Sequence, residues 1–202
     1  MTCKYIKFVK NLIDVLFPII PNCSTTKRLS KRIKTISKFT YFTDDIKNEY
    51  SDVCNQRDKE IVEKLYLKTF ESKEKLENKA KAITLAITVS VTLILNLSNT
   101  ILQIYEHIPS LGIRILYAIY GIIAIGEMLS AALLSAQVFL KDNIMYVVDD
   151  TKKNIKFEYK KCKIINRLLN LKRSNYIYTA YEGIRNSLIM LFGFFITLVI
   201  IA

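Results

Sequence analysis

The chain is poor in the residues that build catalytic and metal-binding sites. Its 202 residues include one histidine, no tryptophan, five glycines and four cysteines, and no cysteine belongs to a Cys-x-x-Cys pair. Zinc fingers and disulfide scaffolds need more closely spaced ligands, so both are disfavoured. No glycine-rich phosphate loop and no Gly-x-Ser-x-Gly motif occurs. We therefore expect no catalytic activity, no cofactor and no metal site.

Charge is also missing from two long segments. Residues 1–81 hold 18 Lys and Arg against 11 Asp and Glu, and residues 140–186 hold 11 against 5. By contrast, residues 82–139 carry three charged side chains and residues 187–202 carry none. A small soluble domain needs polar surface along its whole length, so this pattern indicates an integral membrane protein.

Three runs of the sequence could cross a bilayer. Residues 82–105 contain no charge and would reach about 36 Å as a helix, more than the hydrocarbon core of about 30 Å. Residues 115–140 contain a single charge, Glu127, and a short link joins these two runs. Residues 187–202 would reach only about 24 Å. We predict an all-α membrane protein with a transmembrane hairpin, a C-terminal transmembrane helix and long cytosolic helices.

The positions of the basic residues predict the orientation. Segments rich in Lys and Arg stay in the cytoplasm, and the link at 103–113 has neither residue type. The link is therefore expected outside, where His107 would be an exposed turn residue. The N-terminus and residues 141–186 are expected inside, which makes the protein multi-pass with a cytoplasmic N-terminus. Tyr176, Tyr178 and Tyr181 precede the third span as an interfacial aromatic belt would.

The N-terminal region is both amphipathic and basic. Residues 1–17 place apolar side chains at helical spacing and are followed by Pro18 and Pro21, which predicts an interfacial helix. A second stretch, residues 27–38, holds six basic side chains and no acidic one. We expect lipid contact for this group, with a solvent-facing or partner-facing helix as the alternative, and no nucleic-acid partner. The six are Lys27, Arg28, Lys31, Arg32, Lys34 and Lys38.

Two cytosolic segments are predicted to form a stalk below the membrane. Residues 56–81 lack Gly and Pro, so one helix is expected from Asp58 into the first span. Its ion pairs are expected to be Glu60–Lys64, Glu71–Lys75 and Glu77–Lys81, and its apolar stripe Ile61, Leu65, Leu67, Phe70 and Leu76. Residues 141–171 fit either a β-hairpin around DDTKKN or a helix that continues span two. The absence of Gly and Pro favours the helix.

Polar side chains form a stripe on each of the first two spans. The first stripe consists of Thr84, Thr88, Thr92, Asn96 and Asn99, and the second of Tyr120, Glu127, Ser130 and Gln137. A carboxylate at the middle of a bilayer costs roughly 2.5–3.5 kcal/mol, so Glu127 needs compensation. Hydrogen bonding between packed helices is one explanation, and it is favoured. The other is a water-filled path lined by several copies.

The order of these parts resembles a group of bacterial membrane proteins. The stretch ESKEKLENKAKAITLAITVSVTLIL enters the first span, AQVFLKDNI ends the second, and KFEYKKCKIINRLLNLKRSNY follows as a basic segment. Over about residues 60–170 this layout is similar to SLATT-type and related small transmembrane effectors of nucleotide-signalling antiphage systems such as CBASS and Pycsar. The terminal run at 187–202 departs from their simplest two-span members. The resemblance implies an inner (plasma) membrane effector of abortive infection.

These expectations give one organisation and two candidate functions. The first function is an effector that oligomerises and permeabilises the inner membrane, with the bilayer, further copies of the chain and a cytosolic sensor or signalling protein as partners. The alternative is a non-catalytic membrane anchor that recruits a soluble protein. The expected parts are an amphipathic and basic region (1–42), a cytosolic helix (43–81), the transmembrane hairpin (82–140), a cytosolic basic helical segment (141–186) and the C-terminal transmembrane helix (187–202).

Overall fold

The computed structural model describes residues 13–15, 17–55, 58–106, 108, 110–140, 144–149, 151–152 and 154–201, without the side chains of 93–105 and 197–201. Among these residues all regular structure is helical, which confirms the predicted all-α class. The elements are α2 (Ile19–Ser37), α3 (Asp44–Glu49), α4 (Ser51–Cys54), α5 (Lys59–Glu106), α6 (Leu111–Gln137) and α7 (Ile155–Ile201).

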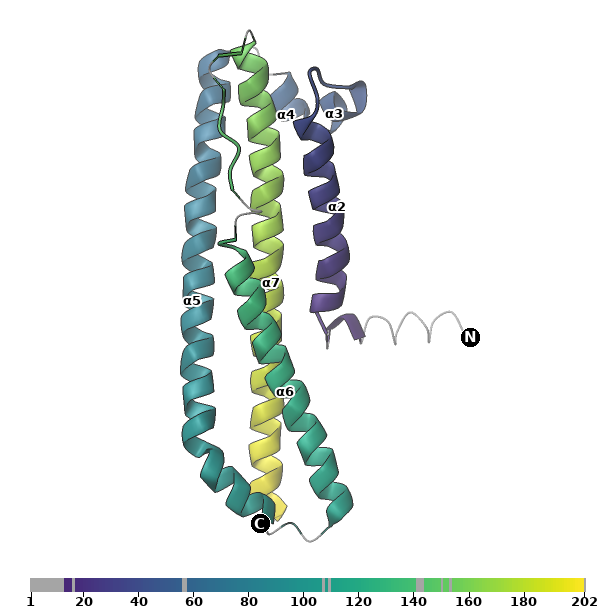
Figure 1. Ribbon diagram of the computed structural model, residues 1–202, viewed down its shortest axis with the longest axis vertical. Coiled ribbons are helices and arrows are strands. Elements are labelled where there is room, and N and C mark those ends of the chain that lie inside the picture. Colours follow the sequence, from purple (N-terminus) through teal and green to yellow (C-terminus); the bar gives the residue numbers. More distant parts are fainter. Residues whose placement is uncertain are drawn as a thin grey trace, which may run out of the picture.

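The molecule is a long bundle built around α7 (Figure 1). Helices α5 and α7 run parallel to each other, and at 1.5 Å per residue each is about 70 Å long. Helix α6 lies antiparallel to α7 in the lower half of the view, and α2 lies beside the upper half of α7. The α5–α6 turn and the end of α7 meet at the lower tip.

Helix α5 is unbroken from Lys59 to Glu106, in agreement with the single long helix predicted here. The predicted apolar stripe is only partly correct: Leu65, Phe70 and Leu76 are half-buried, and Leu76 packs against the lower apolar cluster. Ile61 and Leu67 are 43% and 54% exposed, whereas the buried positions are Val62, Tyr66, Thr69 and Ala80. Tyr66 and Thr69 can be buried because their hydroxyl groups have acceptors: Tyr66 donates to Tyr146 O on the neighbouring segment, and Thr69 donates to Tyr66 O within α5.

The predicted continuous helix over 141–171 is also wrong, because α6 ends at Gln137 and residues 144–149 form an extended strap between α5 and α7 (Figure 1). The alternative β-hairpin does not form either. Asn166 of α7 is fully buried and bonds both backbone groups of Tyr146: Tyr146 N donates to Asn166 Oδ1 at 2.7 Å, and Asn166 Nδ2 donates to Tyr146 O at 3.0 Å. A single side-chain amide thus satisfies the two backbone groups of Tyr146, which in a β-sheet would bond to a neighbouring strand.

Capping side chains determine where α7 begins, at Ile155. Asp149 Oδ1 accepts hydrogen bonds from the backbone N and the hydroxyl of Thr151, at 3.1 and 2.6 Å. Asn154 Oδ1 then accepts from Phe157 N at 3.0 Å, which is an N-cap bond. Cap residues, rather than glycine or proline, therefore interrupt the helix in this part of the chain.

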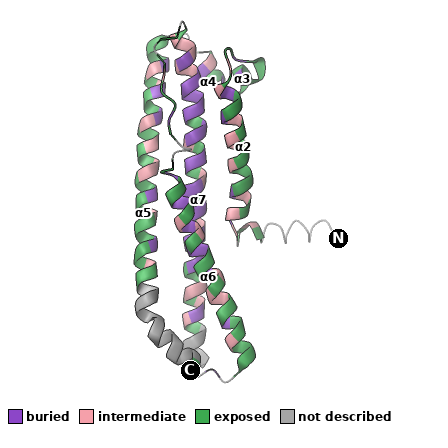
Figure 2. Ribbon diagram, in the orientation of Figure 1, coloured by how far each residue is buried: buried purple, intermediate pink, exposed green. Residues whose placement is uncertain are grey.

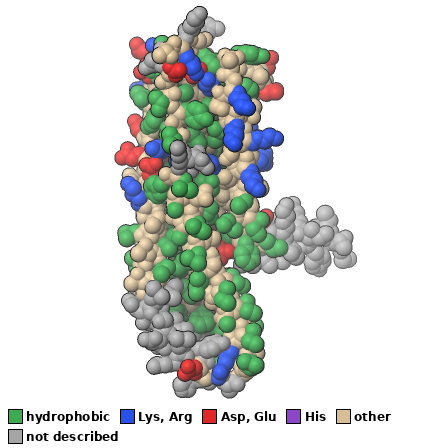
Figure 3. Space-filling model, viewed as in Figure 1, with side chains coloured by type: hydrophobic (Ala, Val, Ile, Leu, Met, Phe, Trp, Pro, Cys, Tyr) green, Lys and Arg blue, Asp and Glu red, His purple; other side chains and the backbone are tan. Residues whose placement is uncertain are grey.

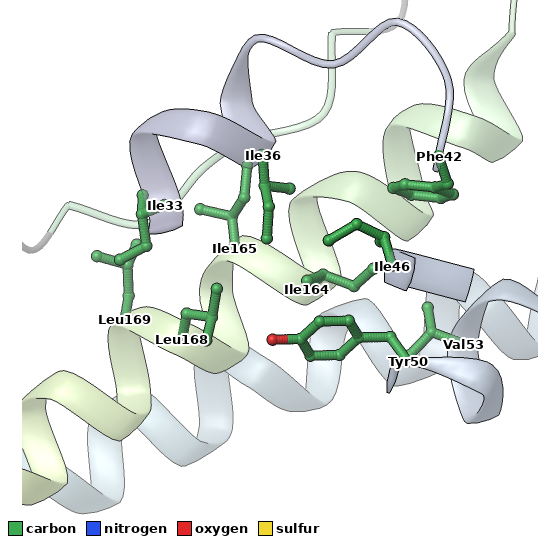
Figure 4. Close-up of a cluster of buried hydrophobic side chains, with 10 residues drawn as sticks. All are labelled: Ile33, Ile36, Phe42, Ile46, Tyr50, Val53, Ile164, Ile165, Leu168 and Leu169. Carbon is green, nitrogen blue, oxygen red and sulfur yellow. The ribbon is translucent and has the colours of Figure 1, made fainter. Parts of the chain in front are cut away.

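Two apolar clusters hold the bundle together. The upper one joins α2, α3 and α4 to four residues of α7, namely Ile164, Ile165, Leu168 and Leu169 (Figure 4). The lower one joins α5, α6 and α7 around Ala80, Ile87, Met128, Leu134 and Ala180. Because α7 contributes to both clusters, it is buried along much of its length, whereas α6 is largely exposed (Figure 2).

Candidate functional site

Exposed apolar side chains form a band on the lower part of the bundle, interrupted on α7 by Glu182 and Arg185. Among the described residues, α6 is the one helix that is long and apolar enough to cross a membrane, and 28% of its apolar stretch is buried. Charged side chains gather on the upper half and at the lower tip (Figure 3). Exposed large apolar side chains lie on all three helices between these regions: Leu85, Val89, Leu116, Ile119, Ile122, Leu129, Leu133, Leu188, Ile189 and Phe192.

Glu127 lies inside this band, between α6 and α7. Its side chain is 5% exposed, and its Oε2 has no hydrogen-bond partner in the part of the chain that the structure describes. The neighbouring residue on α7 is Gly183, where an added Cβ would lie 3.2 Å from the backbone O of Glu127 and 3.4 Å from its Oε2. The absence of a side chain at Gly183 therefore makes room for the carboxyl group of Glu127.

Small residues allow α6 and α7 to approach closely on both sides of Glu127. Ser187 Oγ donates to the backbone O of Ala124 at 2.8 Å, and an added Cβ on Gly183 would lie 3.3 Å from Ala131 Cβ. This is the close packing through Gly, Ala and Ser that is common between membrane helices. The contact was not predicted, although the sequence contains a signal for it: Ala180, Gly183 and Ser187 recur at a spacing of three and four residues.

The polar stripe of α5 meets α6 at only one described point. Thr84, Thr88 and Thr92 are all exposed, but Thr84 Oγ1 lies 3.0 Å from Ser135 Oγ on α6. Each of these threonine hydroxyls donates to the backbone oxygen four residues earlier, at 2.9 to 3.0 Å. Beyond Thr84, the described threonines of the stripe make no hydrogen bond to α6. The side chains of Asn96 and Asn99 lie outside the described residues.

The second predicted stripe does not form one surface. Ser130 Oγ donates to the backbone O of Glu127 at 2.8 Å, and Gln137 is exposed at the end of α6. Tyr120 packs against the cluster of Ile108, Tyr117 and Phe194 near the lower tip. The structure brings neither Thr88 nor Thr92 into contact with Glu127 in a single chain.

At the lower tip, the side chain of Arg114 links α6 to the end of α5. Arg114 Nε donates to Ile108 O at 2.7 Å, and Arg114 Nη2 donates to Glu106 O at 2.8 Å. Glu106 is the last residue of α5, so the guanidinium group bonds a carbonyl at the negative end of that helix. His107 lies outside the described residues.

The basic side chains of α2 do not lie flat on the apolar band. Asn22 Nδ2 donates to Asn175 O and to Thr179 Oγ1, at 3.0 and 2.7 Å, and Ile36 packs in the upper cluster, so α2 runs along α7. Its apolar face is buried on α7. Arg32 forms an ion pair with Glu49. The other five basic side chains, Lys27, Arg28, Lys31, Lys34 and Lys38, are exposed along the upper half.

The cysteines show no sign of metal or disulfide chemistry. Cys23, Cys54 and Cys162 are free thiols, and Cys3 lies outside the described residues. Burial raises the pKa of the Cys162 thiol to about 11, so this thiol stays protonated near neutral pH. No group of three or more potential metal ligands occurs in the described part of the chain.

Comparison of the chain with protein-family models, with curated proteins and with solved structures finds no match. The features of the molecule that bear on function are the apolar band, the contact between Glu127 and Gly183, and the exposed stripe of α5.

Proposed function

We propose that the lower half of the bundle is embedded in a membrane that α5, α6 and the end of α7 all cross. The exposed apolar side chains on all three helices support this, because a soluble monomer rarely exposes so large an apolar surface. Charge returns at the lower tip with Glu106 and Arg114, about 37 Å along α5 from Lys81. This distance is enough for a bilayer, and the end of α7 reaches the same tip (Figure 1).

The second part of the proposal is that several copies assemble through the polar stripe of α5. Thr88 and Thr92 face away from α6 and α7, toward what would be lipid. Their hydroxyls are satisfied within α5, so a single chain can enter the bilayer. Asn96 and Asn99 follow at the same helical spacing in the sequence, and carboxamides in membrane helices favour association with another helix.

The function that this arrangement supports best is permeabilisation of the inner membrane by an oligomeric effector. The observation that carries it is the exposure of Thr88 and Thr92 on one face of the charge-free stretch of α5. Two or three helices cannot enclose a path for ions, so the path requires several copies. The resemblance to SLATT-type effectors suggests antiphage defence by abortive infection, with a cytosolic sensor as the activating partner.

Removing the two exposed hydroxyl groups tests this proposal. In the double variant Thr88→Val/Thr92→Val the shape of α5 is kept, but the groups that would bond a neighbouring copy are lost. Such bonds contribute about 0.6–2 kcal/mol each in membranes, so we expect association to weaken roughly tenfold. Energy transfer between labelled copies in vesicles measures association, and dye release from the same vesicles measures permeabilisation. Both signals should fall together.

The matched control is Ser90→Ala, which removes a hydroxyl from the same helix off the stripe. Ser90 Oγ bonds its own helix at Ala86 O, as the two threonines bond theirs. This variant should associate and release dye like the unmodified chain. If the unmodified chain enters the vesicles but neither associates nor releases dye, the effector function is wrong.

A membrane anchor that recruits a soluble protein is the second candidate. The exposed basic side chains of α2 favour this function, because α2 extends away from the apolar band and places them in the upper half of the bundle. Asn22 lies at the level of Thr179, so Lys27 to Lys38 lie roughly 7–24 Å further along the bundle axis. Screening in salt acts over about 8–10 Å, so most of these charges are better placed to meet an acidic protein than lipid.

A further inference from the structure

A groove runs along the α5–α7 pair toward the apolar band. Its upper section, of about 580 Å³, lies between α5, α7 and the residues Glu49 and Tyr50. A lower section of about 380 Å³ shares Leu76, Lys79 and Ser174 with the upper one, so the two are continuous. The lower section is completed by Ala82, Ile83, Ile177, Tyr178 and Tyr181.

The lower section lies where the charged half of the bundle meets the apolar half. On α5, Lys79 is followed by Lys81 and then by the charge-free run that begins at Ala82. On α7, Tyr178 and Tyr181 are 62% and 59% exposed. Exposed tyrosines at the end of an apolar segment are typical of side chains at the level of lipid headgroups. The groove thus opens at the height of the cytoplasmic membrane surface in the proposed orientation.

The charges that line the groove are mainly positive. Lys75 and Lys79 are one turn apart on α5, and Arg167 lines the upper end together with Glu49. Arg167 is bonded to Asp52 at 3.2 Å. The predicted pair Glu71–Lys75 does not form, and neither Lys75 nor Lys79 has an ion pair among the described residues. The two lysines are therefore the cations of the groove that are available to an anion.

We propose that this groove binds one anionic phospholipid, an assignment that rests on the membrane insertion proposed above. Its phosphate lies against Lys75 and Lys79, with the hydroxyl of Ser174 as a further donor. Its acyl chain follows Ile83 and Ile177 toward the apolar band. Basic pockets between helices at the cytoplasmic surface are a general form of anionic headgroup site. The groove combines such a pocket with an apolar continuation, which a soluble anion does not need.

The chain contains no tryptophan, so a single one placed at the groove gives a clean reporter. In the full chain carrying Tyr181→Trp, fluorescence quenching by brominated lipid measures which lipid occupies the groove. Two vesicle preparations contain the same proportions of phosphatidylcholine and phosphatidylglycerol, and differ only in which lipid carries bromine. General attraction to the negative surface is thus equal in both. We expect stronger quenching by brominated phosphatidylglycerol, with about fivefold local enrichment for each lysine that contacts the phosphate.

Two double variants of α5 distinguish binding at the groove from the effect of the overall charge of the helix. Lys75→Gln/Lys79→Gln should abolish the difference between the two vesicle preparations. Lys64→Gln/Lys68→Gln removes the same charge at the same spacing, eleven residues further from the membrane, and should leave the difference intact. Equal quenching by both brominated lipids would overturn the lipid site while supporting insertion. Absence of quenching by either lipid would contradict insertion itself, and the lipid site with it.

Discussion

Replacement of Gly183 by leucine is expected to force α6 and α7 apart. The first atom of the new side chain would already lie 3.2 Å from the backbone O of Glu127 and 3.3 Å from Ala131 Cβ. The backbone of α6 cannot yield as a flexible side chain could, so the remaining three carbons have no place to go. Overpacking costs typically 1–3 kcal/mol, and here we expect about 3 kcal/mol, or roughly 10 °C in Tm. Thermal unfolding in detergent, followed by circular dichroism, measures the shift.

Gly126→Leu is the matched control for this substitution. Gly126 is also a helical glycine in the apolar band, but nothing lies within 4 Å of an added Cβ there. Leucine favours the helix over glycine by about 1 kcal/mol at either position, so only the contact with the neighbouring helix differs. Gly126→Leu should keep or raise Tm. A similar loss of Tm in both variants would show that α6 and α7 do not pack through Gly183.

Replacement of Glu127 by methionine is expected to stabilise the protein and impair its activity. Oε2 of Glu127 is buried without a hydrogen-bond partner among the described residues, and such a group costs about 1–3 kcal/mol. Methionine is unbranched and fills similar space beside Gly183 without a polar atom that needs a partner. We expect Tm to rise by a few degrees, because a buried oxygen without a partner is removed. On the proposed effector function, dye release from vesicles should fall, because an ionisable group within the membrane is lost.

The variant Glu127→Gln distinguishes charge from shape. The amide keeps the size of the carboxyl group and would also be buried without a full set of partners, so Tm should stay close to that of the unmodified chain. Dye release should change, because the group can no longer carry a negative charge. A lower Tm for Glu127→Met would show that Glu127 is a packing element, and the argument for a functional carboxyl group would fail.

The helices that the sequence predicts well are those with long uninterrupted patterns. The absence of Gly and Pro from residues 56–81 predicts α5. By contrast, the start of α2 at Ile19, between Pro18 and Pro21, is not predicted. The interruption at 144–149 could not be predicted in this way. It depends on Asn166, a residue twenty positions away whose amide bonds Tyr146 in the folded chain. Local patterns do not contain that contact.

The candidate site was predictable only in part for the same reason. Helical spacing identified Thr88, Thr92 and Glu127 as polar positions, but spacing within one helix does not say which faces meet. The neighbour of Glu127 is Gly183, which lies in the segment 141–186 that the sequence assigned to the cytosol, and glycine carries no side-chain signal of its own. The lipid contact predicted for α2 assumed that its apolar face was free, whereas that face is buried on α7.

The most direct test of this account is the topology of the full chain in the membrane. Reporters that distinguish the two sides would be inserted at residues 45, 108 and 160 and fused after residue 202. If α5, α6 and the end of α7 all cross, positions 45 and 160 lie in the cytoplasm, and positions 108 and 202 lie outside. A cytoplasmic position 108, or a position 202 on the same side as residue 160, would contradict the three-span arrangement.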